Sequence, residues 1–69
     1  MDTTSMIISY ESGTLTDVET VELFAELIKS GLVWKLQGHY GRSASGLIEM
    51  NIISKKGVVD YDRLYEVIE

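Results

Sequence analysis

The sequence contains no cysteine, no proline and a single histidine, His39. Without cysteine, neither a disulfide nor a cysteine-ligated zinc site can form, and one histidine cannot build a histidine-rich metal site. We therefore expect no cofactor and no metal. At 69 residues the chain allows one domain with a small core. Its stability must come from efficient packing, or from association with a second copy or with another protein.

Long apolar runs are also absent. No stretch approaches the length of a membrane span, and residues 1–5 do not combine a basic region with an apolar one as a signal peptide does. We therefore expect an intracellular, cytoplasmic protein with no membrane partner. A hydrophobic content of 45% argues against disorder.

Positive charge is scarce, because 11 acidic residues face six lysines and arginines and the net charge is −5. This balance disfavours simple electrostatic binding to nucleic acid, which needs positive charge against phosphate. The distribution is uneven: residues 1–31 and 58–69 are acidic, whereas the middle third is mildly basic. Nucleic acid therefore stays open as a partner. The bases of the middle third are Lys35, Arg42, Lys55 and Lys56.

Glycine positions and hydrophobic spacing predict a mostly α fold, a small bundle of three to four short helices in one domain over residues 1–69. The first helix is expected over residues 3–12, with a strand through residues 6–8 as the competing interpretation. The second begins with the capping box Thr16-Asp17-Val18-Glu19 and runs to Ser30, where Gly31 ends it. Its inward residues are predicted to be Val18, Val21, Phe24, Ala25, Leu27 and Ile28.

The second half is predicted in shorter pieces. Residues 32–37 form a short helical segment, residues 38–41 a tight turn, and residues 42–50 a third helix that Asn51 stops. Residues 52–59 are open to a minor β-hairpin around the turn at 55–57. Asp60 caps a last helix, on which one face carries Tyr61, Leu64, Tyr65 and Ile68.

The most unusual feature is the segment Trp34-Lys35-Leu36-Gln37-Gly38-His39-Tyr40-Gly41-Arg42. We expect Trp34 and Leu36 in the core and Tyr40 at the surface of the turn. His39 and Arg42 at a helix start are the best candidates for binding an anion, although a purely structural turn is the favoured interpretation. The segment is not a P-loop, because the Gly-Lys-Ser/Thr ending is missing.

Glu19, Glu22 and Glu26 form an acidic stripe on the second predicted helix. The stripe is a candidate surface for a basic partner or for mimicry of nucleic acid, but an ordinary solvated helix face is the favoured interpretation. No catalytic residue is predicted. The sequence has no cysteine that could act as a nucleophile with His39, and no serine lies in a nucleophile-elbow context. We therefore expect the protein not to be an enzyme.

Residues 32–50 also fit a helix-turn-helix nucleic-acid binder, with Gly41 in the turn and the basic turn at 55–57 as a wing. Against this, Arg42 is the only base on the recognition helix and Glu49 opposes it. Readers of the major groove usually present several donors there.

Over residues 10–53 the sequence resembles a family of small phage-encoded and related bacterial proteins of unknown function. The resemblance rests on the run Trp-x-Leu-Gln-Gly-His-Tyr-Gly-Arg at residues 34–42, on Leu15-Thr16 with Glu19-Thr20 before it, and on Leu47-Ile48-Glu49 after it. It implies a phage-related origin, and so the cytoplasm of a bacterial host, but supplies no activity.

Two hypotheses follow. The first is a phage-type accessory protein that binds a host or phage protein and modulates a larger machine, without chemistry of its own. The second is the helix-turn-helix nucleic-acid binder. The candidate interaction residues are His39, Tyr40, Arg42, Glu19, Glu22 and Glu26.

Overall fold

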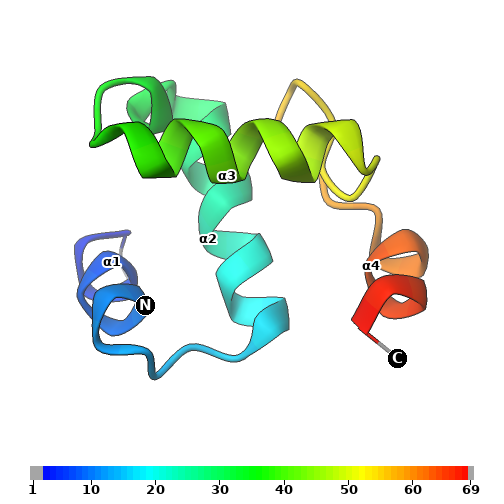
Figure 1. Cartoon of the computed structure of the whole chain (residues 1–69), viewed down its shortest axis with the longest axis horizontal. Helices are drawn as coiled ribbons and strands as arrows, with labels where there is room; N and C mark the ends of the chain where they lie inside the picture. Colours follow the sequence, from blue (N-terminus) through cyan, green and yellow to red (C-terminus); the bar gives the residue numbers. More distant parts are fainter. Residues whose placement is uncertain (1–2, 69) are drawn as a thin grey trace.

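The computed structural model describes residues 3–68 and forms a small helical bundle (Figure 1). α3 lies across α2, and α1 and α4 lie on opposite sides of α2 (Figure 1). The predicted mostly α fold is confirmed. None of the helices in this part of the chain combines the length and apolarity needed to cross a bilayer. The elements are α1 (Thr3–Ser12), α2 (Asp17–Ser30), the 3-10 segment η1 (Leu32–Trp34), α3 (Gly38–Glu49) and α4 (Tyr61–Ile68).

The predicted bounds of α2 are confirmed at both ends. The backbone N–H of Glu19 donates to the Thr16 hydroxyl at 3.1 Å, and the N–H of Thr16 donates to the Glu19 carboxylate at 3.0 Å. This reciprocal capping box satisfies amides that the first helical turn leaves without partners. At the other end Gly31 adopts a left-handed φ of 76° and its N–H donates to the Ile28 carbonyl.

The core is built around α2, which is buried on most of its circumference. Leu23 was not among the predicted inward residues but is fully buried, because α2 is in contact with α1, η1 and α3 and so has more than one covered side. The helical interpretation of α1 is confirmed, with Met6, Ile7 and Tyr10 half-buried against the core. The buried hydrophobic residues are Val21, Leu23, Phe24, Ala25, Leu27, Ile28, Val33, Tyr40, Ala44, Ile52, Ile53 and Leu64.

The start of α3 differs from the prediction, since the expected tight turn at residues 38–41 is the first turn of the helix. Gly38 and Gly41 do not adopt the left-handed conformation that a turn would use. Glycine costs a helix about 1 kcal/mol relative to alanine. Beginning the helix at Gly38 buries Tyr40 one turn before Ala44, and burial of a large aromatic side chain outweighs that cost.

The segment after α3 is an irregular connection rather than a hairpin. Asn51 has a left-handed φ of 61°, which confirms its role as the stop of α3. Within the described chain, residues 52–59 form a single antiparallel bridge, between Ile53 and Val59, instead of two paired strands. The basic turn is present, because the N–H of Gly57 donates to the Ser54 carbonyl at 2.9 Å.

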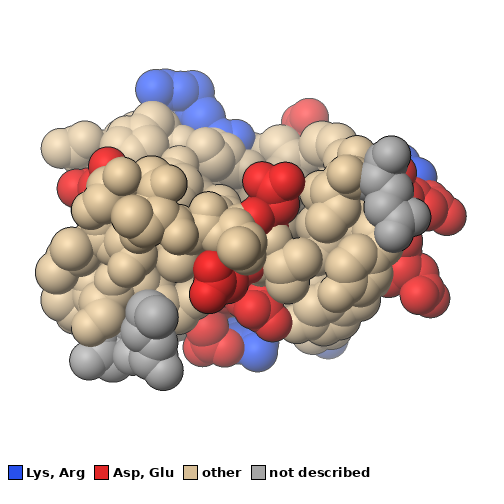
Figure 2. Space-filling view, turned by 90° about the horizontal axis from the view of Figure 1, so that it is seen from below, with Lys and Arg blue, Asp and Glu red and all other residues tan. Residues whose placement is uncertain are grey.

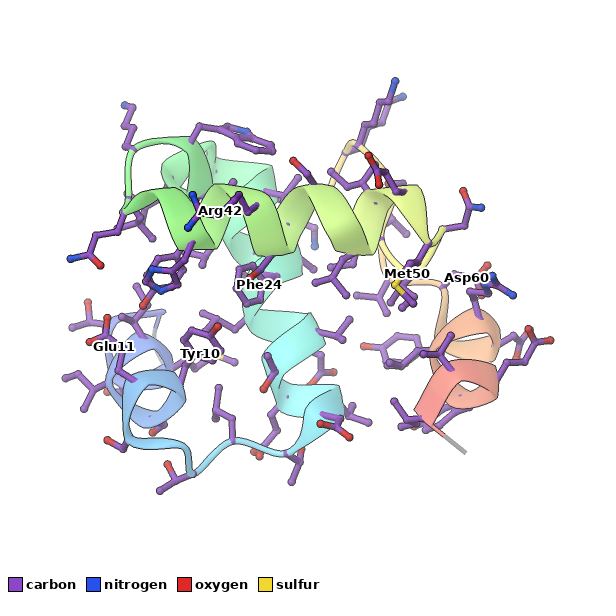
Figure 3. All side chains as sticks on the ribbon, viewed as in Figure 1. Tyr10, Glu11, Phe24, Arg42, Met50 and Asp60 are labelled. Atoms are coloured by element: carbon purple, nitrogen blue, oxygen red, sulfur yellow. The ribbon has the colours of Figure 1, made fainter. Side chains whose placement is uncertain are left out.

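α4 is capped as predicted and is tied to the end of α3. The Asp60 carboxylate accepts from the N–H of Arg63 at 3.1 Å. The Arg63 side chain donates through Nε to the carbonyl of Met50 at 3.0 Å, which places a guanidinium at the negative end of α3. Figure 3 shows Met50 and Asp60 where the end of α3 meets the start of α4.

Gly57 holds the connection between α3 and α4 directly against α2. Its φ is +85°, and a Cβ placed there would lie 2.7 Å from the Ala25 carbonyl oxygen and 2.5 Å from Cγ of Lys29. Gly13 has a similar φ of +76°, but no neighbouring atom lies within 4 Å of a Cβ at that position. Substituting alanine at Gly13 therefore measures the cost of the left-handed backbone alone, whereas alanine at Gly57 adds the cost of a steric clash.

We expect Gly57→Ala to destabilise the fold considerably more than Gly13→Ala. Each alanine takes on left-handed strain of about 1 kcal/mol. Gly57→Ala adds overpacking against the α2 backbone, which costs about 1–3 kcal/mol more. Urea unfolding of the two variants measures the difference, and equal losses would show that the contact with α2 is not tight.

Candidate functional site

Three aromatic rings join α1, α2 and α3. The rings of Tyr10 and Phe24 are perpendicular with centroids 5.5 Å apart, and the Tyr40 ring lies 5.6 Å from Tyr10 and 6.0 Å from Phe24. Figure 3 shows Tyr10 and Phe24 directed toward each other between α1 and α2. Tyr40 is only 2% exposed, so the prediction that it is a surface residue is wrong. Its place in the first turn of α3 directs it toward α2.

The hydroxyl of Tyr40 donates a hydrogen bond to Oε1 of Glu11 at 2.7 Å. Burial of the ring, and then the bond to the Glu11 carboxylate, raise the pKa of Tyr40 to about 12. The pair fastens α1 to α3, which makes Tyr40 a structural residue. Sequence reasoning missed Glu11, because no local pattern links two residues that lie 29 positions apart.

His39 and Arg42 stay at the surface of the first turn of α3, as predicted. The His39 ring packs on Tyr40 with centroids 4.2 Å apart. Arg42 is exposed, its guanidinium lies beside Gly38, where a Cβ would be 3.0 Å from Nη1, and it forms no ion pair with any residue in the described range. No side chain caps the N-terminus of α3, and the N–H of Tyr40 donates to the carbonyl of Gln37 at 2.9 Å.

Trp34 was expected in the core and is 54% exposed instead. η1 contains three residues, and its fully buried member is Val33. Because so short a segment presents one side to α2, the neighbouring Trp34 is turned outward. Its ring lies over Gly41, where a Cβ would be 3.7 Å from Cε3. Leu36, also predicted inside, packs half-buried against the core.

The three glutamates of the predicted acidic stripe do different things. Glu19 is engaged in the capping box, so its carboxylate serves the fold. Glu22 accepts a hydrogen bond from the hydroxyl of Tyr61 on α4 at 2.8 Å. Glu26 forms an ion pair with Lys29 at 3.5 Å. Figure 2 shows carboxylates gathered in the middle of the molecule's lower face, between the α1 side and the α4 side.

Glu22 and Glu26 line a hollow of about 350 Å³ between α1, α2 and the segment that leads into α4. Its apolar lining comes from Met6, Val58 and Tyr61, among others. A larger, open hollow lies on the other side of Val58 and Tyr61 and is lined in part by Asp60 and Asp62. Val58 and Tyr61 therefore form a ridge between two depressions, each of which carries carboxylates.

The ridge continues along α4 as an exposed apolar face. Leu64 is the buried residue of α4, although the helix presents four further apolar side chains around it. The rings of Tyr61 and Tyr65 lie 6.5 Å apart. Ile68 follows Tyr65 at the i+3 position and so lies on the same face. We call this the α4 surface and define it as Val58 (60% exposed), Tyr61 (43%), Tyr65 (45%) and Ile68 (40%).

Sequence spacing predicted the face of α4 but not its exposure. The length of the chain could have indicated that this face is exposed, because a small core has too few elements to cover a fourth helix.

The hydrogen bond to Glu22, followed by burial, raises the pKa of Tyr61. Among residues 3–68 no group of three or more His, Asp or Glu side chains is placed to hold a metal ion.

The family model described as a domain of unknown function, DUF7417, matches residues 2–68. The chain belongs to the DUF7417 family. No curated protein and no solved structure matches it. The DUF7417 match includes all four helices, and therefore both the first turn of α3 and the α4 surface. The predicted membership of a family of unknown function is confirmed at this level.

The pair of Tyr40 and Glu11 predicts a loss of stability at alkaline pH. An unfolded tyrosine ionises near its ordinary pKa of 10, whereas folded Tyr40 holds its proton to about 12. The stability that the raised pKa provides is therefore complete below pH 10 and is lost as the pH rises toward 12. At neutral pH we expect Tyr40→Phe to lose about 1–2 kcal/mol with the hydrogen bond.

Urea unfolding of the wild type and Tyr40→Phe at a series of pH values between 7 and 12 measures this effect. The difference between the two is expected to shrink above pH 10. The exposed Tyr65→Phe serves as the control and should match the wild type at neutral pH. A difference between wild type and Tyr40→Phe that stays constant across the series would contradict the prediction.

Proposed function

We propose that this DUF7417 protein is a phage-type accessory protein that acts in the bacterial cytoplasm by binding another protein, without chemistry of its own. The observation that carries the proposal is the α4 surface. A helix with one buried residue exposes two tyrosines and an isoleucine on one face, next to a valine that is 60% exposed. Contiguous apolar patches with a polar rim are typical of protein-interaction sites.

The composition of the α4 surface also favours protein binding. Tyrosine is enriched among the residues that dominate binding energy, because it combines a large apolar ring with a polar end and few rotatable bonds. Tyr61 is already held in place by Glu22, so little of its freedom remains to be lost on binding. The start of α3, in comparison, offers His39 and Arg42 beside one exposed aromatic ring, that of Trp34 over Gly41, since Tyr40 is buried.

Affinity purification from bacterial lysate tests the proposal. We expect the wild type to retain a specific protein that the double variant Val58→Ser, Tyr65→Ser loses. Ile8→Ser is the matched control, since Ile8 on α1 is 62% exposed but lies outside the α4 surface. The proposal fails if the wild type retains nothing beyond a purification without bait, or if the double variant retains the same protein.

Nucleic-acid binding is the second candidate function. The helix-turn-helix cannot use residues 32–50 as two helices, because η1 has three residues and α3 begins at Gly38. The remaining version pairs α2 with α3. In its favour, the exposed ring of Trp34 lies beside the N-terminal half of α3, which also carries Arg42, and aromatic rings next to bases can stack on nucleobases.

The charges on α3 make this the weaker candidate. Arg42 is its only base, and Glu49 lies at its C-terminal end. We therefore expect no shift of duplex DNA at micromolar protein in low salt, where attraction to phosphate is strongest. A shift that Arg42→Ala abolishes would reverse the order of the two candidates.

A further inference from the structure

We propose that the α4 surface binds a basic amphipathic segment of another protein, in which apolar side chains are flanked by lysines or arginines. The inference rests on the proposed function and specifies the chemistry of the partner. It combines two features of the same part of the molecule: an uncovered apolar face and a local excess of carboxylates.

The exposed apolar face requires apolar side chains in the middle of the partner segment. Val58 and Tyr61 form the ridge between the two hollows, and Tyr65 and Ile68 extend it along α4. A helix or extended segment laid along this ridge places apolar side chains against the rings and into the depressions beside them. Removing these surfaces from water supplies the non-directional part of the binding free energy.

The carboxylates beside the apolar face require positively charged residues on both sides of those apolar side chains. Glu22 borders the ridge from α2, and Asp62 borders it from α4. The Tyr61 hydroxyl satisfies one oxygen of Glu22 but leaves its negative charge in place. Within residues 3–68, neither Glu22 nor Asp62 forms an ion pair. Lysine or arginine at the edges of the bound segment would provide the missing counter-charges.

Two of the neighbouring bases are already paired within the chain and so do not neutralise Glu22 or Asp62. Glu26 pairs with Lys29 at 3.5 Å, and Glu66 pairs with Arg63 at 3.2 Å. Arg63 is further held by the carbonyl of Met50. Lys29 and Arg63 are thus occupied, and Lys55 is the one base lining the hollows that no ion pair among the described residues occupies. The hollows on the two sides of the ridge are lined by four carboxylates, Glu22, Glu26, Asp60 and Asp62, and by two lysines, Lys29 and Lys55, so negative charge remains in excess.

The same charges argue against a second copy of this chain as the occupant. Two copies joined through their α4 surfaces would bring Glu22 and Asp62 of both into one interface, which is four carboxylates against two lysines, Lys55 of each copy, that form no ion pair within the described chain. Like charges placed opposite each other across an interface are unfavourable and act against that partner. An acidic or neutral apolar segment likewise leaves both carboxylates without counter-charges.

Two synthetic peptides of equal length test the inference. Both carry leucines at helical spacing, and one has lysines and the other glutamates at every remaining position. Fluorescence anisotropy with the labelled peptides and the whole chain measures affinity. We expect the lysine peptide to bind at least about tenfold more tightly. Its affinity should fall as NaCl rises, because salt screens exposed charge pairs.

Variants locate the binding on the surface. Tyr65→Ser removes part of the apolar face, and we expect a loss of roughly tenfold for the lysine peptide. Glu22→Gln with Asp62→Asn keeps the shape and removes the two charges, and the expected loss is roughly fivefold. Matched controls are Ile8→Ser on α1 and Glu49→Gln on α3, which should bind as the wild type does. Circular dichroism confirms that each variant is folded.

Three results would overturn the inference. They are equal binding of the two peptides, wild-type affinity in both Tyr65→Ser and the charge-neutralised variant, or a dimer in light scattering that Tyr65→Ser converts to monomer. The proposed function is separable from this inference. Affinity purification could return a protein whose retention depends on Val58 and Tyr65 while the two peptides bind equally. The proposed function of protein binding would then hold, and the inference of a basic partner would fail. If nothing is retained and neither peptide binds, both fail.

Discussion

α2 is covered on most of its circumference, and the other elements of the fold take their positions from contact with it. Six of the twelve buried hydrophobic residues belong to this one helix. η1 and α3 cover one side, α1 covers another, and Gly57 brings the connection to α4 against its backbone. Because a chain of 69 residues has little else to pack, this arrangement completes the core at α2 and leaves α4 with one buried side chain.

The ends of the helices could be predicted from the sequence, because capping residues a few positions apart determine them. The reciprocal bonds between Thr16 and Glu19 fix one end of α2, and a left-handed Gly31 fixes the other; both follow from residue types a few positions apart. The same holds for Asn51 and for the Asp60 cap of α4. These signals involve neighbours in the chain, so they can be inferred without knowledge of the packing.

The errors occur where packing overrides local preference. Two glycines around Tyr40 indicate a turn, yet burial of that ring against Phe24 and Tyr10 makes helix the better solution. Starting α3 earlier changes the direction of every side chain in the segment, and the three-residue η1 then turns Trp34 to solvent. The expected roles of Trp34 and Tyr40 were exchanged for this reason. The candidate site shows the same division: Glu22 was identified from charge spacing, whereas its contact with Tyr61 depends on the tertiary fold.

α4 has a consequence for how the domain behaves between binding events. A helix of eight residues is too short to persist on its own in water. Its order rests on Leu64, on the Asp60 cap, and on two hydrogen bonds to the rest of the chain, from Arg63 to Met50 and from Tyr61 to Glu22. Opening of this one unit therefore costs less free energy than unfolding of the whole chain. A ligand that binds the folded form of α4 stabilises that helix against local opening. It would therefore slow amide hydrogen exchange in α4 before it changes exchange in α2.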